Sequence, residues 1–311
     1  NPKAKQEYLD ACEEQITESI IPAYKRLEGY LLQLERSSLA IAGVWQLPEG
    51  TAYYSYCLKQ NCGVNNSPDE LYEIAKIEMS RIKGQLQILN ELTDNKKTTN
   101  SSLSIASDTF DIDEKGRVEC LAFFEEETNK VASHLDKYFS VQPSAKLSVL
   151  EVPERSSANR SLAFYLPPRG NPPADGKLYV NTWKADNLTK RLAKSYAYHE
   201  GIPGHHLQKG IQADLQDLPT FRRFLPFEAY TEGWAMYAEQ LGHEMTGTED
   251  LNDKIGILQS DLFRTARMMA DIGLHHKKWL REQAIDFMTD NTTLSKTAAE
   301  DEVDRYIVWP G

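Results

Sequence analysis

The sequence predicts a mainly helical protein with one small β-sheet, an α+β fold class. Two observations predict it. Apolar residues recur at helical spacing through most of the 311 residues. Only three short segments, 147–152, 161–166 and 177–182, instead combine Val, Leu, Tyr and Phe as β-strands do, and a proline-rich stretch at 167–173 interrupts them. We therefore expect one small sheet among helices.

The N-terminal part of the chain is expected to be helical. Apolar residues at helical spacing predict a helix over 7–39. Residues 67–70, Ser-Pro-Asp-Glu, are typical of a helix start, because serine caps the free N–H groups, proline is tolerated in the first turn and acids favour the positive end of the dipole. This helix is expected to reach Leu92. Residues 93–117 are polar and predict a loop, and a further helix is expected over 118–139.

The change from helices to strands near residue 140 suggests how the chain is divided. Residues 1–140 are expected to form a helical subdomain. Residues 141–311 are expected to hold the sheet and, beginning with a helix over 187–199, the helices that carry the chemistry. Together they would form one catalytic unit, a fragment of a longer protein.

Residues 199–206, His-Glu-Gly-Ile-Pro-Gly-His-His, hold three of the seven histidines and place a glutamate beside the first. Neutral imidazole is the commonest protein ligand for zinc, and a carboxylate next to a ligand can take a proton from water. A pair of histidines on a helix is more often simply solvated. The stretch therefore indicates metal-assisted hydrolysis only in combination with further acidic residues.

The spacing of these histidines requires a break in the helix. His205 follows His199 by six residues, which on an ideal helix places their side chains about 120° apart. Pro203 lacks an N–H and clashes with the preceding turn, and the glycines on both sides of it give the backbone freedom. We expect an interruption between residues 201 and 205 that returns His205 towards His199.

A second cluster contains Glu228, Glu232 and Glu239, which are four and seven residues apart and share one helical face. Such spacing usually marks a solvated acidic face. The stretch is otherwise apolar, however, which predicts a buried helix. Buried carboxylates need a partner, and a metal ion is one of the few good ones.

A third cluster places Arg264, Arg267, Asp271 and His275 at steps of three, four and four residues, a polar stripe on an otherwise apolar helix. An ordinary salt-bridged face explains this pattern as well as a functional one does. The functional alternative is a wall of the active site, with donors for a tetrahedral oxyanion or for a substrate carboxylate.

Four segments carry a resemblance to a known family. They are 199–208 (HEGIPGHHLQ), 232–239 (EGWAMYAE), 271–275 (DIGLH) and 305–311 (RYIVWPG). In order and spacing they resemble the C-terminal half of the domain of unknown function 885 family, over about residues 20–311. That family in turn resembles the helical zinc metallopeptidases, such as thimet oligopeptidase, carboxypeptidase Taq and angiotensin-converting enzyme. The resemblance thus implies a zincin-like helical domain.

The resemblance also implies the metal ligands. In helical zinc metallopeptidases, two helix histidines and a glutamate from a later helix bind zinc. Here that implies one zinc ion held by His199, His205 and Glu232, with Glu200 as the general base. His206 competes with His205 for the second ligand position, because Pro203 disturbs the usual spacing.

We therefore expect a zinc-dependent peptidase that hydrolyses short peptides, in which His275, Tyr306 or Arg267 stabilises the oxyanion. Two alternatives stay open: a non-catalytic metal-binding or structural protein, and a zinc amidase that acts on a non-peptide or cell-wall amide. A net charge of −11 argues against nucleic acid as a partner. The sequence holds no apolar run of membrane-spanning length. The many exported bacterial members of the resembling family imply an extracytoplasmic location, periplasmic or anchored as a lipoprotein.

Overall fold

The computed structural model describes residues 2–36, 41–94, 109–158, 160–169, 174–225, 227–247 and 250–311. The chain forms two compact units, Asn1–Ala42 and Gly43–Gly311. This division differs from the one expected near residue 140. The reason is that a long late helix, α12 (Leu251–His275), packs against both α4 (Pro68–Asp94) and α8 (Lys190–Tyr196), so residues from both sides of position 140 share one unit.

The first unit is a helical segment made of α1 (Pro2–Gln15), a π-helical turn (Ile16–Ile20) and α2 (Ile21–Glu35), as the sequence predicts up to residue 35. None of the side chains in these helices is buried. The last part of the predicted helix, at 37–39, lies outside the described residues.

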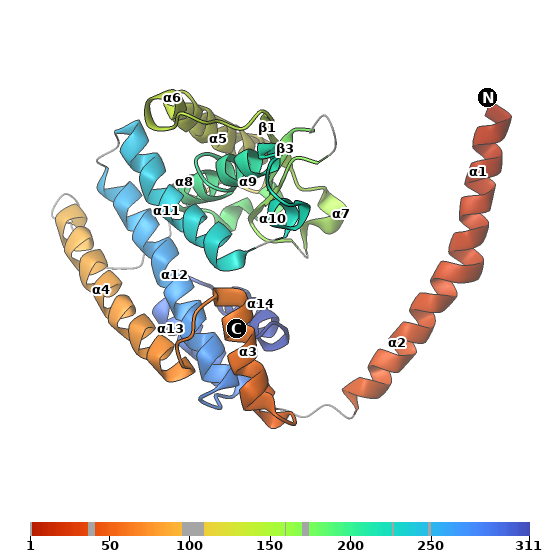
Figure 1. Ribbon diagram of the computed structural model, residues 1–311, viewed down its shortest axis with the longest axis horizontal. Coiled ribbons are helices and arrows are strands. Elements are labelled where there is room, and N and C mark those ends of the chain that lie inside the picture. Colours follow the sequence, from red (N-terminus) through yellow and green to blue (C-terminus); the bar gives the residue numbers. More distant parts are fainter. Residues whose placement is uncertain are drawn as a thin grey trace. The chain divides into compact units, whose positions relative to one another are not determined.

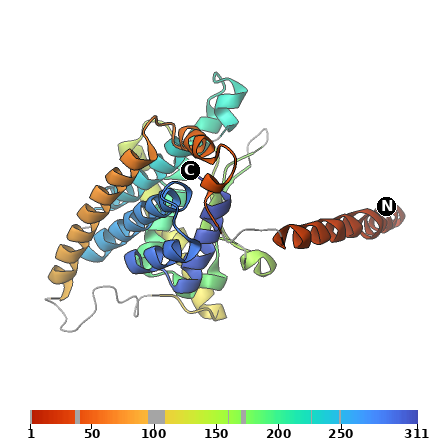
Figure 2. The ribbon, with the colours of Figure 1, turned by 90° about the horizontal axis from the view of Figure 1, so that it is seen from below.

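The second unit begins with helices. The described elements before the sheet are a 3₁₀ turn (Val44–Gln46), α3 (Gly50–Cys62), α4, α5 (Glu114–Ala132) and α6 (Leu135–Tyr138). Ser67 caps α4 as predicted: the Glu70 backbone N–H donates to the Ser67 hydroxyl at 3.3 Å, and the Ser67 N–H donates to the Glu70 carboxylate at 2.7 Å. Figures 1 and 2 both show α4 lying along α12.

The sheet has three strands in the order β1-β3-β2. β1 (Leu147–Glu151) pairs in parallel with the central strand β3 (Gly176–Val180), and β2 (Ala163–Leu166) pairs antiparallel with β3. The three predicted strands are thus confirmed, with bounds that differ by at most two residues. Part of the predicted proline-rich interruption, 170–173, lies outside the described residues. β2 is left at one edge of the sheet.

The remaining helices carry the C-terminal half of the chain. After the short helix α7 (Glu154–Ser157) and a 3₁₀ segment (Thr182–Asn187) come α8, a π-helical turn (Ala197–Gly201), α9 (His205–Asp214), α10 (Thr220–Phe224), α11 (Glu228–Thr246), α12, α13 (Arg281–Asn291) and α14 (Lys296–Val308). In the part of the chain that the structure describes, no helix combines the length and the hydropathy needed to cross a membrane.

The main core lies between the sheet and the helices that surround it. Leu178 of β3 is fully buried with Phe124 of α5, Tyr198 of the π-helical turn and Leu207 of α9. This packing fixes both ends of the segment between α8 and α9. The sequence singles out that segment for its histidines.

Candidate metal centre

The interruption predicted around Pro203 is confirmed. Helix α8 continues into the π-helical turn that carries His199 and Glu200, the chain then leaves helical geometry, and α9 begins at His205. The Ile202–Pro203 peptide bond is cis. The Gly204 N–H donates to the Tyr198 carbonyl at 2.9 Å, which closes this turn.

Gly204 is required by close packing within that turn. A Cβ atom at this position would lie 1.9 Å from the His199 carbonyl oxygen and 2.4 Å from that of Tyr198. Glycine is the residue that permits such an approach of two backbone segments. The turn brings the start of α9 back against the π-helical turn, so His199 and His205 face the same point.

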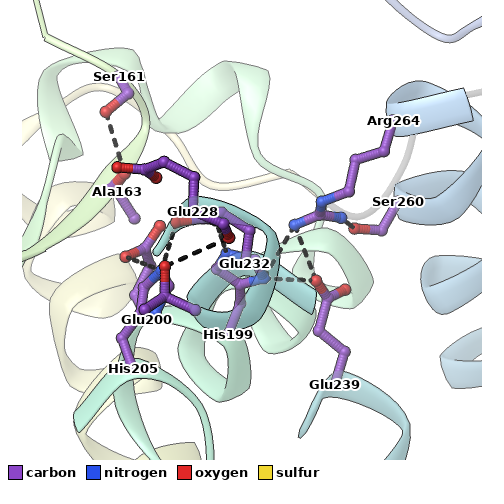
Figure 3. A network of polar contacts seen from close by, with 11 residues as sticks. Ser161, Ala163, His199, Glu200, His205, Glu228, Glu232, Glu239, Ser260 and Arg264 are labelled. Carbon is purple, nitrogen blue, oxygen red and sulfur yellow. Dashed lines mark hydrogen bonds and ion pairs between the residues drawn. The ribbon is translucent and has the colours of Figure 1, made fainter. Parts of the chain in front are cut away.

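The turn brings together His199, His205 and Glu232, the three residues expected to bind metal. One ligand atom from each side chain can be chosen so that all three atoms lie within 4.8 Å of one another. Oxygens of the Glu232 carboxylate lie 3.3 Å from Nε2 of His199 and 3.3 Å from Nε2 of His205 (Figure 3). Two imidazole nitrogens and one carboxylate oxygen are a donor set typical of catalytic zinc. The residues present therefore fit a zinc ion.

His206 does not share this arrangement. Its ring is buried, Nδ1 lies 3.0 Å from the Tyr165 hydroxyl, and it hydrogen-bonds the backbone of Ala145. Burial lowers the pKa of His206 to about 4. The geometry therefore favours His205 over His206 as the second ligand.

The orientation of His199 is fixed from behind by an ion pair between Glu239, from the predicted acidic cluster, and Arg264, from the predicted polar stripe. His199 Nδ1 donates to Glu239 at 2.8 Å, and Arg264 Nη2 contacts the same carboxylate oxygen at 2.8 Å. Arg264 is held in turn by the Ser260 hydroxyl (Figure 3). Because Nδ1 donates to Glu239, Nε2 is the ring nitrogen that faces Glu232 and that could bind a metal. A ligand histidine commonly donates to a carboxylate in this way.

The three glutamates of α11 differ in burial, although they share a face. Glu228 is exposed, the side chain of Glu232 is 48% exposed, and Glu239 is almost fully buried. The seven-residue step from Glu232 to Glu239 places Glu239 on the same face two turns further along the helix, as the sequence indicates, but behind His199 rather than at the ligand position. The cluster thus has a buried side at Glu239 and a side open to solvent at Glu232.

The charges of the site are strongly coupled. Burial opposes protonation of His199, but hydrogen bonds to Glu232 and Glu239 outweigh it and raise the pKa of His199 to about 9. Burial favours the protonated form of Glu232, yet hydrogen bonds from both histidines lower its pKa well below the usual range. In Glu239, the same burial effect is overcome by the charge of Arg264, which lowers its pKa. Two carboxylates therefore stay ionised around the histidines.

Glu200, the expected general base, lies at the cluster. One of its carboxylate oxygens is 4.0 Å from Nε2 of His205, and its side chain is 13% exposed. Burial raises the pKa of Glu200. A carboxylate that is more basic than usual and lies next to a metal position is suited to accept a proton from water.

The structure does not give His275 the role of oxyanion donor that we expected. Both of its ring nitrogens are engaged: Nδ1 accepts from the Val44 N–H at 3.2 Å, and Nε2 donates to the Tyr306 carbonyl at 3.0 Å. The ring is fully buried. Eleven residues separate it from Arg264, about 16 Å along α12. His275 thus links α12 to Val44, near the start of the second unit, and to Tyr306 of α14.

The other residues of the predicted polar stripe also separate. Asp271 accepts from the Tyr54 hydroxyl at 2.6 Å and from the Gly311 N–H at 3.2 Å, so it holds the last described residues against α3. Tyr306 is buried and donates its hydroxyl to Glu302 at 2.7 Å. Arg267 is exposed, and its guanidinium lies 5.3 Å from the centre of the Tyr306 ring. Of this stripe, Arg264 is the member in contact with the metal cluster.

The fold is shared with two solved bacterial proteins. One is described as "the putative lipoprotein from Colwellia psychrerythraea", with a TM-score of 0.93 and 30% sequence identity over 100% of this chain. A second, "a putative lipoprotein of unknown function from Shewanella oneidensis", has a TM-score of 0.64 and 18% identity over 97% of this chain. The chain spans about half of each, 54% and 56% of their lengths.

Two further comparisons concern the sequence. No curated protein matches it. The family described as "Bacterial protein of unknown function (DUF885)" matches residues 1–311.

Proposed function

The chain belongs to the bacterial DUF885 family, and we propose that it is a zinc-dependent peptidase with His199, His205 and Glu232 as the metal ligands. The observation that carries this proposal is the convergence of these three side chains, from two helices and the turn between α8 and α9, with Glu200 beside them. Their donor set leaves room for further ligands, which is typical of catalytic rather than structural zinc.

The residues around the ligands support hydrolysis. A zinc ion held there supplies Lewis-acid chemistry, because it polarises a carbonyl group and acidifies water. Glu200 is placed to accept the proton of the attacking water and to pass it to the leaving amine. Glu239 and Arg264 fix the ring of His199, which keeps its Nε2 directed at the ligand position.

The surroundings of the site favour an extended peptide as the substrate. β2 lies at the edge of the sheet, and an edge strand can hold a peptide through main-chain hydrogen bonds. Figure 3 shows Ala163, the first residue of this strand, and Ser161, which precedes the strand, on the same side of the site as Glu228 and Glu232. The half-exposed carboxylate of Glu232 leaves the site open to such a substrate.

We further propose that the protein acts outside the cytoplasm. Both similar structures are described as lipoproteins, and a lipoprotein is attached to a membrane through an acyl anchor rather than through a spanning helix.

The first test is metal content together with the Glu200→Gln variant. The amide has nearly the shape of the carboxylate but cannot accept the proton. We expect the variant to bind zinc like the parent and to lose about 10² to 10⁴ in turnover of a peptide library. Glu244→Gln is the matched control, since Glu244 is exposed on α11 and its carboxylate accepts a hydrogen bond from Gln240.

Two results would contradict the proposal. Zinc absorption-edge scattering from a different set of ligands would remove the metal site. A zinc-loaded protein that cleaves no peptide, with Glu200→Gln indistinguishable from it, would instead indicate a non-catalytic metal-binding protein.

A further inference from the structure

Two arginines flank the ring of Tyr306, beyond the metal ligands. The guanidinium carbon of Arg267, from α12, lies 5.3 Å from the ring centre, and that of Arg305, from α14, lies 5.9 Å away. Both distances are within the range of cation–π attraction. An aromatic ring holds a guanidinium in place without neutralising its charge, so the N–H donors stay available.

The two arginines differ in how their charge is compensated. Glu302 accepts the Tyr306 hydroxyl at 2.7 Å and also pairs with Arg305 at 2.5 Å. Arg267 is exposed and has no ion pair with any described residue. The neighbouring carboxylate, Asp271, already bonds the Tyr54 hydroxyl and the Gly311 N–H. Arg267 therefore offers a positioned fork of donors to a ligand.

The guanidinium of Arg267 belongs to the part of α12 that adjoins the metal cluster. Arg264, which contacts the Glu239 carboxylate behind His199, is one turn earlier on the same helix, a rise of about 4.5 Å. Arg264 Nη2 also lies 3.0 Å from Nδ1 of His199, so this part of α12 adjoins a residue expected to bind the metal.

We propose that Arg267 binds the C-terminal carboxylate of the peptide substrate, one or two residues beyond the bond that is cleaved. This inference rests on the proposed peptidase function and gives it a substrate class, free-acid peptides with a short C-terminal side. One or two extended residues span about 3 to 7 Å, and Arg267 lies one helical turn from Arg264, which contacts Glu239 and His199. A planar guanidinium with free N–H groups matches a carboxylate in a bidentate pair.

The test compares a peptide with a free C-terminus and the same peptide as a C-terminal amide. We expect the parent to prefer the free acid. Arg267→Ala should lower kcat/KM for the free acid by about 10- to 100-fold, mainly through KM, because a hydrogen bond to a charged group is lost. The amide should change little, and Arg267→Lys should lie between. Arg281→Ala is the control, since Arg281 is a partly exposed arginine that already pairs with Asp304.

A binding measurement separates this inference from the proposed function. Calorimetric titration of metal-free protein with a short free-acid peptide and with its amide should show tighter binding of the acid, and Arg267→Ala should remove the difference. Equal binding or equal cleavage of acid and amide by the parent would overturn the carboxylate site. Discrimination in binding without any cleavage would keep this site and reject the peptidase.

Discussion

At the scale of single residues, the position of a proton decides what the cluster can bind. His199 can offer Nε2 to a metal only while Nδ1 carries its hydrogen, and Glu239 accepts that hydrogen at 2.8 Å. Arg264 keeps this buried carboxylate ionised. An unpaired buried charge would be costly, so the arginine and the glutamate stabilise each other as well as the histidine.

Replacing Glu239 tests this arrangement directly. Glu239→Gln keeps the size of the side chain, but its amide can donate to His199 and leaves Arg264 without a counter-charge. We expect zinc affinity to fall about 10- to 100-fold, measured by competition with a chromophoric chelator. Glu244→Gln, on the exposed side of the same helix, should bind zinc like the parent. An unchanged affinity in Glu239→Gln would show that Glu239 does not orient the ligand.

At the scale of elements, the candidate metal centre depends on an irregular turn rather than on a regular helix. The sequence allowed this to be predicted, because Pro203 cannot continue a helix and the His199–His205 spacing does not fit one. The strands and the capped start of α4 were predictable for the same reason: their patterns are local. The role of His275 was not, since its partners Val44 and Tyr306 are far away in the sequence.

Long-range packing also explains why the unit boundary differs from the predicted one. A composition change near residue 140 marks the start of the sheet, but α12 bridges the helices on both sides of it. Arg264 and Arg267 look alike as neighbours on one stripe. Only their partners, Glu239 for one and the Tyr306 ring for the other, separate their roles.

The turn itself can be tested at Gly204. A methyl group there would lie 1.9 Å from the His199 carbonyl oxygen, so Gly204→Ala must displace the turn. We expect lower stability, by about 1 to 3 kcal/mol, and weaker zinc binding. Gly84→Ala is the control, because nothing lies within 4 Å of its added Cβ and α4 should gain about 1 kcal/mol of helix propensity. Parent-like zinc affinity in Gly204→Ala would mean that the turn does not place His205.

At the scale of the whole molecule, two buried histidines act on stability in opposite pH ranges. The pKa of His206 is lowered to about 4 by burial, from an ordinary value of 6.5. Between these two pH values His206 is protonated in the unfolded chain but neutral in the folded protein. Folding stability therefore decreases as pH falls below 6.5. The pKa of His199 is raised to about 9. Its contribution to folding stability is therefore fully present below pH 6.5 and is lost as pH rises to 9.

The metal-free protein should consequently be most stable near pH 6.5, as measured by urea unfolding in the presence of a chelator. Between pH 6.5 and 4 we expect His206 to account for a loss on the order of 3 kcal/mol, and His206→Gln should flatten this limb because glutamine does not titrate. On the alkaline limb, zinc should reverse the trend, because it competes with the proton at His199 and binds more tightly as pH rises. An acid limb that is equally steep in His206→Gln would assign the loss to other groups. A zinc effect that is independent of pH would exclude His199 as a ligand.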